Sequence, residues 1–371
     1  MARISPHFGI IYVLFIGVCI VVFSNSTFVP SVGTIVATIA SSTPRVAVIA
    51  EATTSIPSTP LPQSLQKQVT SIPEKKVTSP IQAPSIAAST KAVPVPLSQN
   101  VSLDTPAATL RAALVNIICD VPLGSGLGSI SGSGVFIDPK GIILTNAHIA
   151  QYFLLRDRNV SCVIRSGSPA IGAYKAELIY ISSAWIHANA KVLTQTAPVG
   201  TGEYDFAFLA VTQSVTKNPL PSSFPFIALS QVPPTSGAPV VIASYGAQFL
   251  DMNQIQSSLF PTIVFGSIKD VFTFATNTVD VLDLGGSAAA QEGSSGGGVA
   301  DASGILVGTI TTSTIHGPTD TRSLGAITAS YIRSDYESET GKPFDRLLVD
   351  PLSTTIADFA LQIPALESVI V

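Results

Sequence analysis

The chain has 371 residues, of which 46 % are hydrophobic and 11 % charged, and its mean hydropathy is +0.47. This composition excludes a wholly disordered protein, because such chains combine low hydrophobicity with high net charge. The formal net charge is −4 at pH 7, and no cluster of lysine and arginine is available to neutralise a phosphate backbone. We therefore expect no nucleic acid among the partners of this protein.

The N-terminus carries a segment that favours a membrane. Sixteen residues from Phe8 to Phe23 have no charge, and Arg3 precedes them. A positive flank on the N-terminal side predicts that residues 1–7 are cytoplasmic and that the chain after the segment lies outside the cytoplasm. Sixteen residues are few for a span and many for a signal-peptide core. We predict a retained transmembrane anchor over residues 8–27, and a signal segment cleaved near Ser24 is the alternative.

Residues 28–105 are predicted to be a disordered linker. The stretch from Ser41 to Thr105 contains nine prolines and nineteen serines or threonines in 65 residues, and it has no Phe, Tyr or Trp. Such a segment cannot bury enough apolar area to offset the entropy lost on ordering. It therefore reads as a Pro/Ser/Thr-rich tether between the anchor and a folded domain.

The chain has three cysteines, and two of them fall in the part predicted to fold. Cys19 lies inside the apolar segment, whereas Cys119 and Cys162 lie in separate predicted strands. A location outside the cytoplasm permits disulfides, so these two cysteines can pair. Two buried free thiols are the alternative, and the oxidising location favours the disulfide.

From Leu114 onward the sequence is a series of short β-branched runs separated by Gly, Pro and Ser. Nine runs fit this description: LVNIIC, SGVFI, GIILTN, VSCVIR, AELIYIS, YDFAFLAV, APVVIASYG, TIVFGSI and GILVGTITT. Repeated short strands with turn signals predict an all-β fold, and the length of about 230 residues suits two packed antiparallel β-barrels. Helical segments are expected only after Asn146, over 184–194, and as a C-terminal helix over 329–340. The folded domain is expected to span 106–345, followed by a C-terminal tail over 346–371.

Two polar residues stand at the ends of apolar strands. His148 follows the strand GIILTN and opens a short predicted helix, while Asp205 leads directly into the apolar strand FAFLAV. A carboxylate beside buried strand residues is costly unless it is hydrogen-bonded, which indicates that Asp205 has a partner. Taken singly, His148 also fits a structural histidine, and Asp205 also fits a turn residue at the start of a strand.

A glycine-rich turn over residues 291–298 reads QEGSSGGG and is followed by a predicted hairpin rather than a helix, which disfavours a phosphate-binding loop. The turn is instead suited to present a serine nucleophile. Gly293 lets the chain bend so that the N–H groups of Gly293 and Ser295 converge on one point, where they would stabilise a developing oxyanion. A serine nucleophile needs a histidine base, and the base needs an orienting carboxylate.

Three strings in this order, GSGVFIDPKGIILTNAHIA, YDFAFLAV and GSSGGGVADASGILVGTITT, resemble the trypsin-like, chymotrypsin-fold serine proteases. The nearest likeness is to the bacterial Deg/HtrA-type branch. The resemblance covers about residues 112–340 and implies His148 as general base, Asp205 as its orienting acid and Ser295 as nucleophile. It implies Gly293 and Ser295 as oxyanion donors. The 31 residues after Thr340 lead us to expect a protease domain without the PDZ module of many Deg/HtrA proteins.

The resemblance also implies a substrate pocket. Its walls would be residues 288–291 and 309–312, the latter including Thr309, Thr311 and Thr312. Ala289 stands where trypsin-like enzymes selective for Lys and Arg carry an acid. No charge lies among the wall residues, so small or medium apolar residues are expected before the scissile bond. Ser294 stands where the family has Asn or Asp, so activation through an ion pair with a newly cut N-terminus is not expected. Residues 184–203 form an insertion before Asp205.

The expected function is that of a serine endopeptidase acting on protein or peptide substrates, with no metal or cofactor. The implied location is the bacterial cell membrane, with a single span and the protease domain outside the cytoplasm, or secretion if the N-terminal segment is cleaved. The sequence gives no indication of the oligomeric state. A catalytically silent double-barrel binding or scaffold domain at the cell surface is the alternative.

Overall fold

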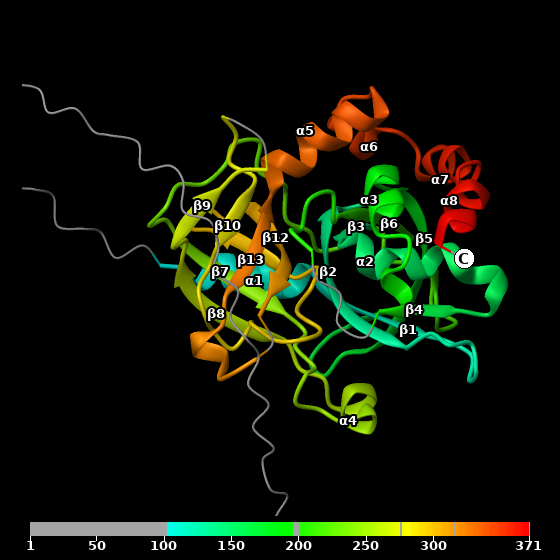
Figure 1. Cartoon of the computed structure of the whole chain (residues 1–371), viewed down its shortest axis with the longest axis horizontal. Helices are drawn as coiled ribbons and strands as arrows, with labels where there is room; N and C mark the ends of the chain where they lie inside the picture. The colour runs from blue at the N-terminus through cyan, green and yellow to red at the C-terminus, as the bar shows by residue number, and fades with distance from the viewer. Residues whose placement is uncertain (1–101, 196–199, 275–276, 315, 371) are drawn as a thin grey trace, which may run out of the picture. The chain divides into compact units, whose positions relative to one another are not determined.

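The computed structural model describes residues 102–195, 200–274, 277–314 and 316–370. The segment 8–27 and most of the linker lie outside this range, so the predictions of an anchor and of a disordered tether stay predictions. Within the described part, no helix combines the length and hydrophobicity that a membrane span requires. The described residues form two β-structures followed by a series of helices, as Figure 1 shows.

The first β-structure is a closed six-stranded antiparallel barrel with the strand order β1-β2-β3-β6-β5-β4. Closure leaves no edge strand to pair with other chains. Its interior is apolar, and all four residues of β3 are buried. The strands are β1 (Leu114–Asp120), β2 (Ile130–Asp138), β3 (Ile142–Thr145), β4 (Ser161–Ser166), β5 (Ile171–Ile181) and β6 (Ala207–Ser214).

The second β-structure is a seven-stranded antiparallel sheet with the order β8-β7-β11-β12-β13-β10-β9. Its two outer strands, β8 and β9, are separated only by Ile268 and Lys269, so one bent segment forms both edges and gives the sheet its barrel-like closure. The prediction of two antiparallel β-structures is confirmed: one is a closed barrel and the other is a seven-stranded sheet. The strands are β7 (Pro239–Ser244), β8 (Thr262–Ser267), β9 (Asp270–Phe272), β10 (Val281–Asp283), β11 (Gly298–Asp301), β12 (Leu306–Ser313) and β13 (Leu324–Thr328).

Short helices occupy the connections between strands. Those after Asn146 and within 184–194 were expected, whereas α4 and η3 were not. These elements are α2 (Ala147–Ala150), η1 (Gln151–Arg158), α3 (Ser183–Ala188), η2 (Val192–Thr194), α4 (Met252–Ser257) and η3 (Thr319–Thr321). The insertion before Asp205 thus contains α3, which begins with Ser182 as its N-cap and packs against the C-terminal helix α8.

Helix α1 (Asp104–Ala113), which the strand pattern did not indicate, precedes the first strand and packs on β7 and β11 of the second β-structure. Leu110 is fully buried there. A Cβ added to Gly298 would come within 2.7 Å of Leu110 Cδ1, so this position requires a glycine for the helix to approach the sheet. The helix therefore connects the start of the first barrel with the second sheet.

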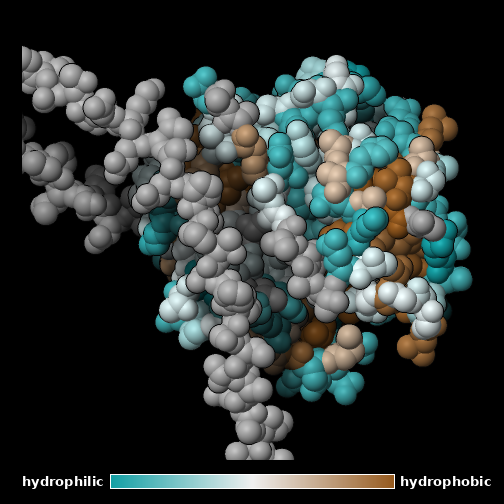
Figure 2. Space-filling view, in the orientation of Figure 1, coloured by the Kyte–Doolittle hydropathy of each residue, from teal (hydrophilic) through white to brown (hydrophobic). Residues whose placement is uncertain are grey.

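The C-terminal part of the chain contains four helices rather than the single predicted one. Helix α5 (Ala329–Thr340) has the predicted bounds, and α6 (Phe344–Val349), α7 (Leu352–Ala360) and α8 (Ile363–Ile370) follow it. The predicted tail is thus mostly helical, and it buries Phe359 and Leu366 in the main core. Figure 1 shows these orange and red helices along the first barrel, and Figure 2 shows apolar side chains around this region of an otherwise mixed surface.

An aromatic cluster attaches α5 and α6 to the first barrel. The ring centroids of Tyr180 and Tyr336 are 4.9 Å apart, and those of Phe208 and Phe344 are 5.6 Å apart. Phe206, the residue after Asp205, stacks on Tyr180 at 5.5 Å. Such ring pairs contribute beyond the area that they bury. The cluster therefore fixes the start of β6, where Asp205 lies.

Helix α5 also carries a carboxyl group in an unfavourable place. The Oδ2 atom of Asp335 is buried and has no hydrogen-bond partner among the described residues. Burial, together with the charges of Glu339 and Glu203, raises the pKa of Asp335 to about 7. The folded protein therefore binds this proton more tightly than the unfolded chain does, and its free energy of unfolding falls as the pH rises from about 4 to 7.

We expect Asp335→Asn to raise the free energy of unfolding by roughly 1 to 2 kcal/mol at pH 8, allowing for solvent screening, and to have little effect near pH 4. Urea unfolding at both pH values measures this difference. Asp358→Asn is the control, since Asp358 is exposed and its one ion pair among the described residues is that with Lys342 at 3.7 Å. Equal effects of Asp335→Asn at the two pH values would contradict the prediction.

The two cysteines of the folded domain face each other across β1 and β4. Cys119 pairs with Cys162 in the register of these strands, and the structure joins them in a disulfide with a Cα–Cα distance of 4.0 Å. The two cysteines are 43 positions apart in the sequence. The bond connects adjacent strands of the first barrel.

Replacing both cysteines with alanine is expected to destabilise the first barrel by about 2 to 4 kcal/mol, because the crosslink restricts the unfolded chain. Denaturant unfolding of the wild-type and double-variant proteins gives this value. Alkylation of the denatured, unreduced protein followed by intact-mass analysis is the check on the bond itself. Two alkylated thiols in addition to Cys19 would show that no disulfide forms.

Candidate active site

Asp205 is held at the start of β6 by its own backbone and by the preceding turn. Its N–H donates to the carbonyl of Gly202 at 3.1 Å, and its carbonyl accepts from Asn146 Nδ2 at 2.8 Å. Tyr204 has a φ of +58°, an uncommon conformation for a residue with a side chain. The turn directs the carboxylate inward, where the residue is only 6 % exposed.

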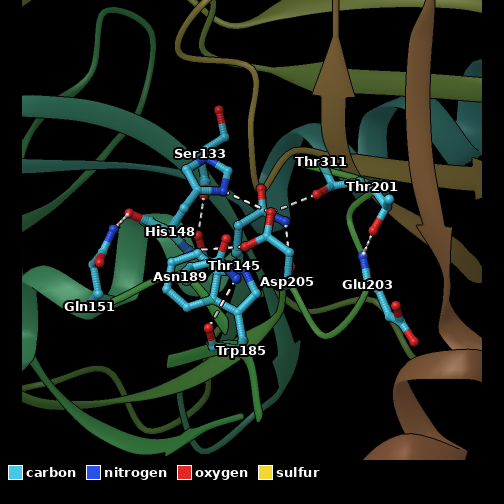
Figure 3. Close-up of polar contacts among 11 residues, drawn as sticks. Ser133, Thr145, His148, Gln151, Trp185, Asn189, Thr201, Glu203, Asp205 and Thr311 are labelled. Carbon is cyan, nitrogen blue, oxygen red and sulfur yellow. Dashed lines mark hydrogen bonds and ion pairs between the residues drawn. The ribbon is translucent and has the colours of Figure 1, made fainter. Parts of the chain in front are cut away.

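The Asp205 carboxylate contacts His148 twice. Its Oδ2 lies 2.8 Å from His148 Nδ1, and its Oδ1 accepts from the backbone N–H of His148 at 3.0 Å. His148 lies in α2, directly after β3, and Gln151 Nε2 donates to its carbonyl at 2.9 Å. Figure 3 shows the imidazole between these groups. The side chain of His148 is 25 % exposed, so its remaining edge can reach a substrate.

A third donor completes the environment of the carboxylate. Thr311 of β12 donates its hydroxyl to Asp205 Oδ2 at 2.6 Å across the interface of the two β-structures. Burial alone would raise the pKa of Asp205, but the charge of His148 and the hydrogen bonds from His148 and Thr311 outweigh burial and hold this pKa below its ordinary value. Asp205 is therefore ionised at neutral pH and can stabilise a protonated His148.

Ser133 of β2 connects the serine turn to both β-structures. Its N–H donates to the carbonyl of Ser295 at 2.7 Å, and its hydroxyl donates to the carbonyl of Gly293 at 2.8 Å. The same hydroxyl accepts from the N–H of Tyr245 at 2.8 Å. Its carbonyl accepts from Thr145, three residues before His148, at 2.7 Å. The serine turn is thus fixed beside the strand end that carries His148.

Glycine is required at two positions of this turn. Gly293 and Gly296 have φ values of +88° and +84°. A Cβ at Gly296 would lie 2.0 Å from the carbonyl oxygen of Ser133, and one at Gly293 would lie 2.7 Å from that of Tyr245. The close packing of the turn on its neighbours explains why the sequence is so rich in glycine here.

The turn presents backbone donors. Within the described residues, the N–H groups of Gly293 and Ser295 donate to no acceptor, which leaves both free for a substrate oxyanion. The carbonyl of Glu292 is turned away from them and accepts from Ala247 at 2.8 Å. The hydroxyl of Ser295 makes no hydrogen bond to the described residues, so a bond to His148 is not formed in this state. Ser294 instead bonds Ser244 through their hydroxyls at 3.0 Å.

Two threonines of the predicted pocket use their hydroxyls for hydrogen bonds inside the protein. The hydroxyl of Thr309 donates to the carbonyl of Gly297 at 3.0 Å, and that of Thr311 donates to Asp205. Ala289 is fully buried in the core cluster of the second sheet. The side chain of Thr312 lies outside what the structure describes. Thr309 and Thr311 therefore support the turn and the carboxylate, and the substrate pocket stays a prediction.

Sequence reasoning missed three contributors to the site. Ser133 and Thr145 act through hydrogen bonds that depend on strand register, and no motif marked them. Asn146 could have been suspected, because it directly precedes the helix of His148 and is fully buried. Its Oδ1 atom has no partner among the described residues, whereas its Nδ2 holds the backbone of Asp205.

Two packed antiparallel β-structures with a His–Asp pair at their interface and a glycine-rich serine turn define a chymotrypsin-like fold. Residues 132–308 match the family model described as trypsin-like peptidase domain. Over these residues the chain is therefore similar to trypsin-like peptidase domains.

Comparison with solved structures gives distant matches. The Rv3671c protease from M. tuberculosis in its active form is 18 % identical, with a TM-score of 0.41, over 64 % of this chain and 86 % of that one. The inactive form of the Rv3671c protease is 17 % identical, with a TM-score of 0.39, over 64 % of this chain and 93 % of the other. No curated protein sequence matches the chain.

Proposed function

We propose that this protein is a serine endopeptidase that hydrolyses peptide bonds through an acyl-enzyme. The observation that carries the proposal is the contact between His148 Nδ1 and Asp205 Oδ2 at 2.8 Å. The same carboxylate also accepts a hydrogen bond from the hydroxyl of Thr311. A buried carboxylate that orients a partly exposed imidazole is the arrangement that a serine nucleophile needs. The similarity of residues 132–308 to trypsin-like peptidase domains supports the same activity.

The residues take the following roles. The Oγ atom of Ser295 attacks the scissile carbonyl carbon, and His148 Nε2 accepts the hydroxyl proton. The N–H groups of Gly293 and Ser295 stabilise the oxyanion of the tetrahedral intermediate. His148 then returns the proton to the leaving amine as the C–N bond breaks. A water molecule, activated by the same imidazole, hydrolyses the acyl-enzyme and regenerates Ser295. Asp205 stabilises the imidazolium that forms in each step.

The absence of a hydrogen bond between His148 and Ser295 is compatible with these roles. Catalytic hydrogen bonds are often long in ligand-free enzymes and shorten when substrate binds. If the protein is instead a catalytically silent scaffold, the hydroxyl of Ser295 stays without a hydrogen bond to His148 and has ordinary hydroxyl reactivity.

A fluorophosphonate probe separates the two possibilities. The full chain, solubilised in detergent, is treated with the probe, and the labelled peptide is identified by mass spectrometry. Labelling at Ser295, abolished in Ser295→Ala and retained in Ser303→Ala, is the expected result. Unlabelled wild-type protein would favour the scaffold function.

We also propose that residues 8–27 anchor the protein in the bacterial cell membrane with the peptidase domain outside the cytoplasm. The support is the uncharged run from Phe8 to Phe23 behind Arg3, together with a cysteine pairing that suits an oxidising compartment. External protease treatment of spheroplasts should degrade the domain while intact cytoplasmic markers survive. Recovery of an undegraded domain would contradict this location.

A further inference from the structure

Arg322 is a buried cation without an acidic partner. It follows η3, precedes β13 and is only 6 % exposed. Within the described part of the chain, no carboxylate oxygen lies within 4.0 Å of its nitrogens. Burying a charge is costly unless hydrogen bonds compensate for the lost water. The hydrogen bonds that this guanidinium makes therefore indicate its role in the fold.

The guanidinium joins three separate segments. Nε donates to the carbonyl of Gly317 at 2.9 Å, and Nη1 donates to Gln248 Oε1 at 2.6 Å and to the carbonyl of Ala290 at 2.7 Å. Its Cζ lies 5.7 Å from the ring centroid of Phe249. One planar group thus holds segments around residues 248, 290 and 317 in a fixed mutual geometry.

Two of these segments form the serine turn and its support. Ala290 lies five residues before Ser295, and the turns between them are closed by hydrogen bonds such as that from Ser294 N–H to the carbonyl of Gln291. Gln248 follows Ala247, whose N–H donates to the carbonyl of Glu292 at 2.8 Å. Arg322 therefore closes a ring of contacts that runs through Ala290, Glu292, Ala247 and Gln248.

The bond from Ala247 to Glu292 decides where Gly293 N–H points. The peptide unit between Glu292 and Gly293 is planar and trans, so its carbonyl and its N–H point in opposite directions. While Ala247 holds the carbonyl on one side, the N–H of Gly293 is directed to the other, where the oxyanion would lie. A rotation of this peptide unit would remove one of the two donors.

We propose that Arg322 is a positioning residue that keeps the Glu292–Gly293 peptide unit in the orientation that offers Gly293 N–H to the substrate. This inference rests on the proposed peptidase function. The role matters because the side chain of Ser294 bonds a neutral hydroxyl, that of Ser244, and no ion pair among the described residues holds the turn. A planar guanidinium can serve three acceptors in one plane, which the single ammonium nitrogen of lysine cannot reproduce.

The test compares Arg322→Lys and Arg322→Ala with Arg333→Lys. Arg333 is a suitable control because it lies on α5, bonds Asp345 at 2.7 Å and packs on the Phe344 ring, and no hydrogen bond among the described residues joins it to the serine turn. The full-length proteins are compared in three measurements: kcat and KM on a peptide substrate, the rate of fluorophosphonate labelling, and amide hydrogen exchange of peptides covering 287–295 and 245–249.

Loss of one oxyanion donor typically costs a factor of about 10² to 10³ in kcat, so we expect Arg322→Lys to lower kcat by at least about tenfold with a smaller change in KM. Hydrogen exchange should accelerate in 287–295 and 245–249 but not in β4 and β5, and labelling should slow in parallel. Arg333→Lys should leave all three measurements near wild type.

Two outcomes would overturn the proposal. One is wild-type exchange in 287–295 for both Arg322 variants, whatever their activity. The other is an acceleration spread evenly over the domain, which would show only a loss of global stability. The exchange measurement does not depend on activity. If the wild-type protein is not labelled at all, the proposed peptidase function fails, and the exchange data still decide whether Arg322 holds the turn.

Discussion

Replacing Ser295 or His148 with alanine is expected to lower peptide hydrolysis by roughly four to six orders of magnitude. The two side chains act as one unit, because an alcohol that cannot transfer its proton is a poor nucleophile and a base without the alcohol has nothing to activate. The double variant should therefore be no slower than either single variant. Steady-state rates on a casein or peptide substrate measure the effect.

Neither substitution should unfold the protein. The hydroxyl of Ser295 makes no hydrogen bond to the described residues, so its removal leaves no buried partner unsatisfied. Loss of the His148 ring leaves the Asp205 carboxylate with two donors, the N–H of residue 148 and the hydroxyl of Thr311. Thermal unfolding monitored by circular dichroism provides the check. His187→Ala, which alters an exposed side chain on α3, is the activity control. Turnover by Ser295→Ala near the wild-type rate would rule out this nucleophile.

The strands of this fold could be predicted because their signal is local. Runs such as GIILTN and YDFAFLAV combine β-branched or aromatic residues with flanking turn residues, and both coincide with strands of the first barrel. Helix α5 was also predicted with its bounds. In the structure Thr328 caps its first turn and Gly341 follows its last residue.

Helix α1 and the helices after 343 could not be predicted with the same ease. Each is ten residues or shorter, and isolated helices of this length are marginal in water. They form because one to three side chains per helix, such as Leu110 in α1 and Phe359 in α7, are buried against the β-structures. That burial depends on tertiary structure, which the local sequence does not specify.

The predicted pocket stays a prediction, but two of its threonines make hydrogen bonds that the sequence did not indicate. Thr309 donates to the carbonyl of Gly297 and Thr311 to Asp205. The register between β12 and β13 shifts between Ile310 and Thr312, so simple strand alternation does not hold at Thr311. Alternation could not have shown that Thr311 reaches Asp205, 106 residues away in the sequence.

Asp205→Asn is expected to reduce kcat by a factor of about 10³ to 10⁴ with the fold intact. An amide at this position can donate a hydrogen to His148 Nδ1. That contact favours the tautomer with the proton on Nε2, which cannot accept the proton of Ser295. Stopped assays over a range of pH, with active-site titration to count competent enzyme, give the ratio. A kcat within tenfold of wild type would remove Asp205 from the proposed triad.

Thr311→Val provides the finer test of the same carboxylate. Valine keeps the shape of threonine but removes the hydroxyl that donates to Asp205 Oδ2, so the pKa of Asp205 should rise toward its ordinary value. A carboxylate with a lowered pKa stabilises the folded protein above about pH 4 and loses this contribution as the pH falls through the folded-state pKa. Thr311→Val should therefore unfold at a higher pH on the acid side. Its kcat should fall by about ten- to 150-fold, the equivalent of one charge-assisted hydrogen bond, with KM little changed. Thr309→Val is the matched comparison, because Thr309 is also buried on β12 but bonds the carbonyl of Gly297. If both valine variants shift the acid transition and kcat equally, the hydroxyl of Thr311 has no specific role at Asp205.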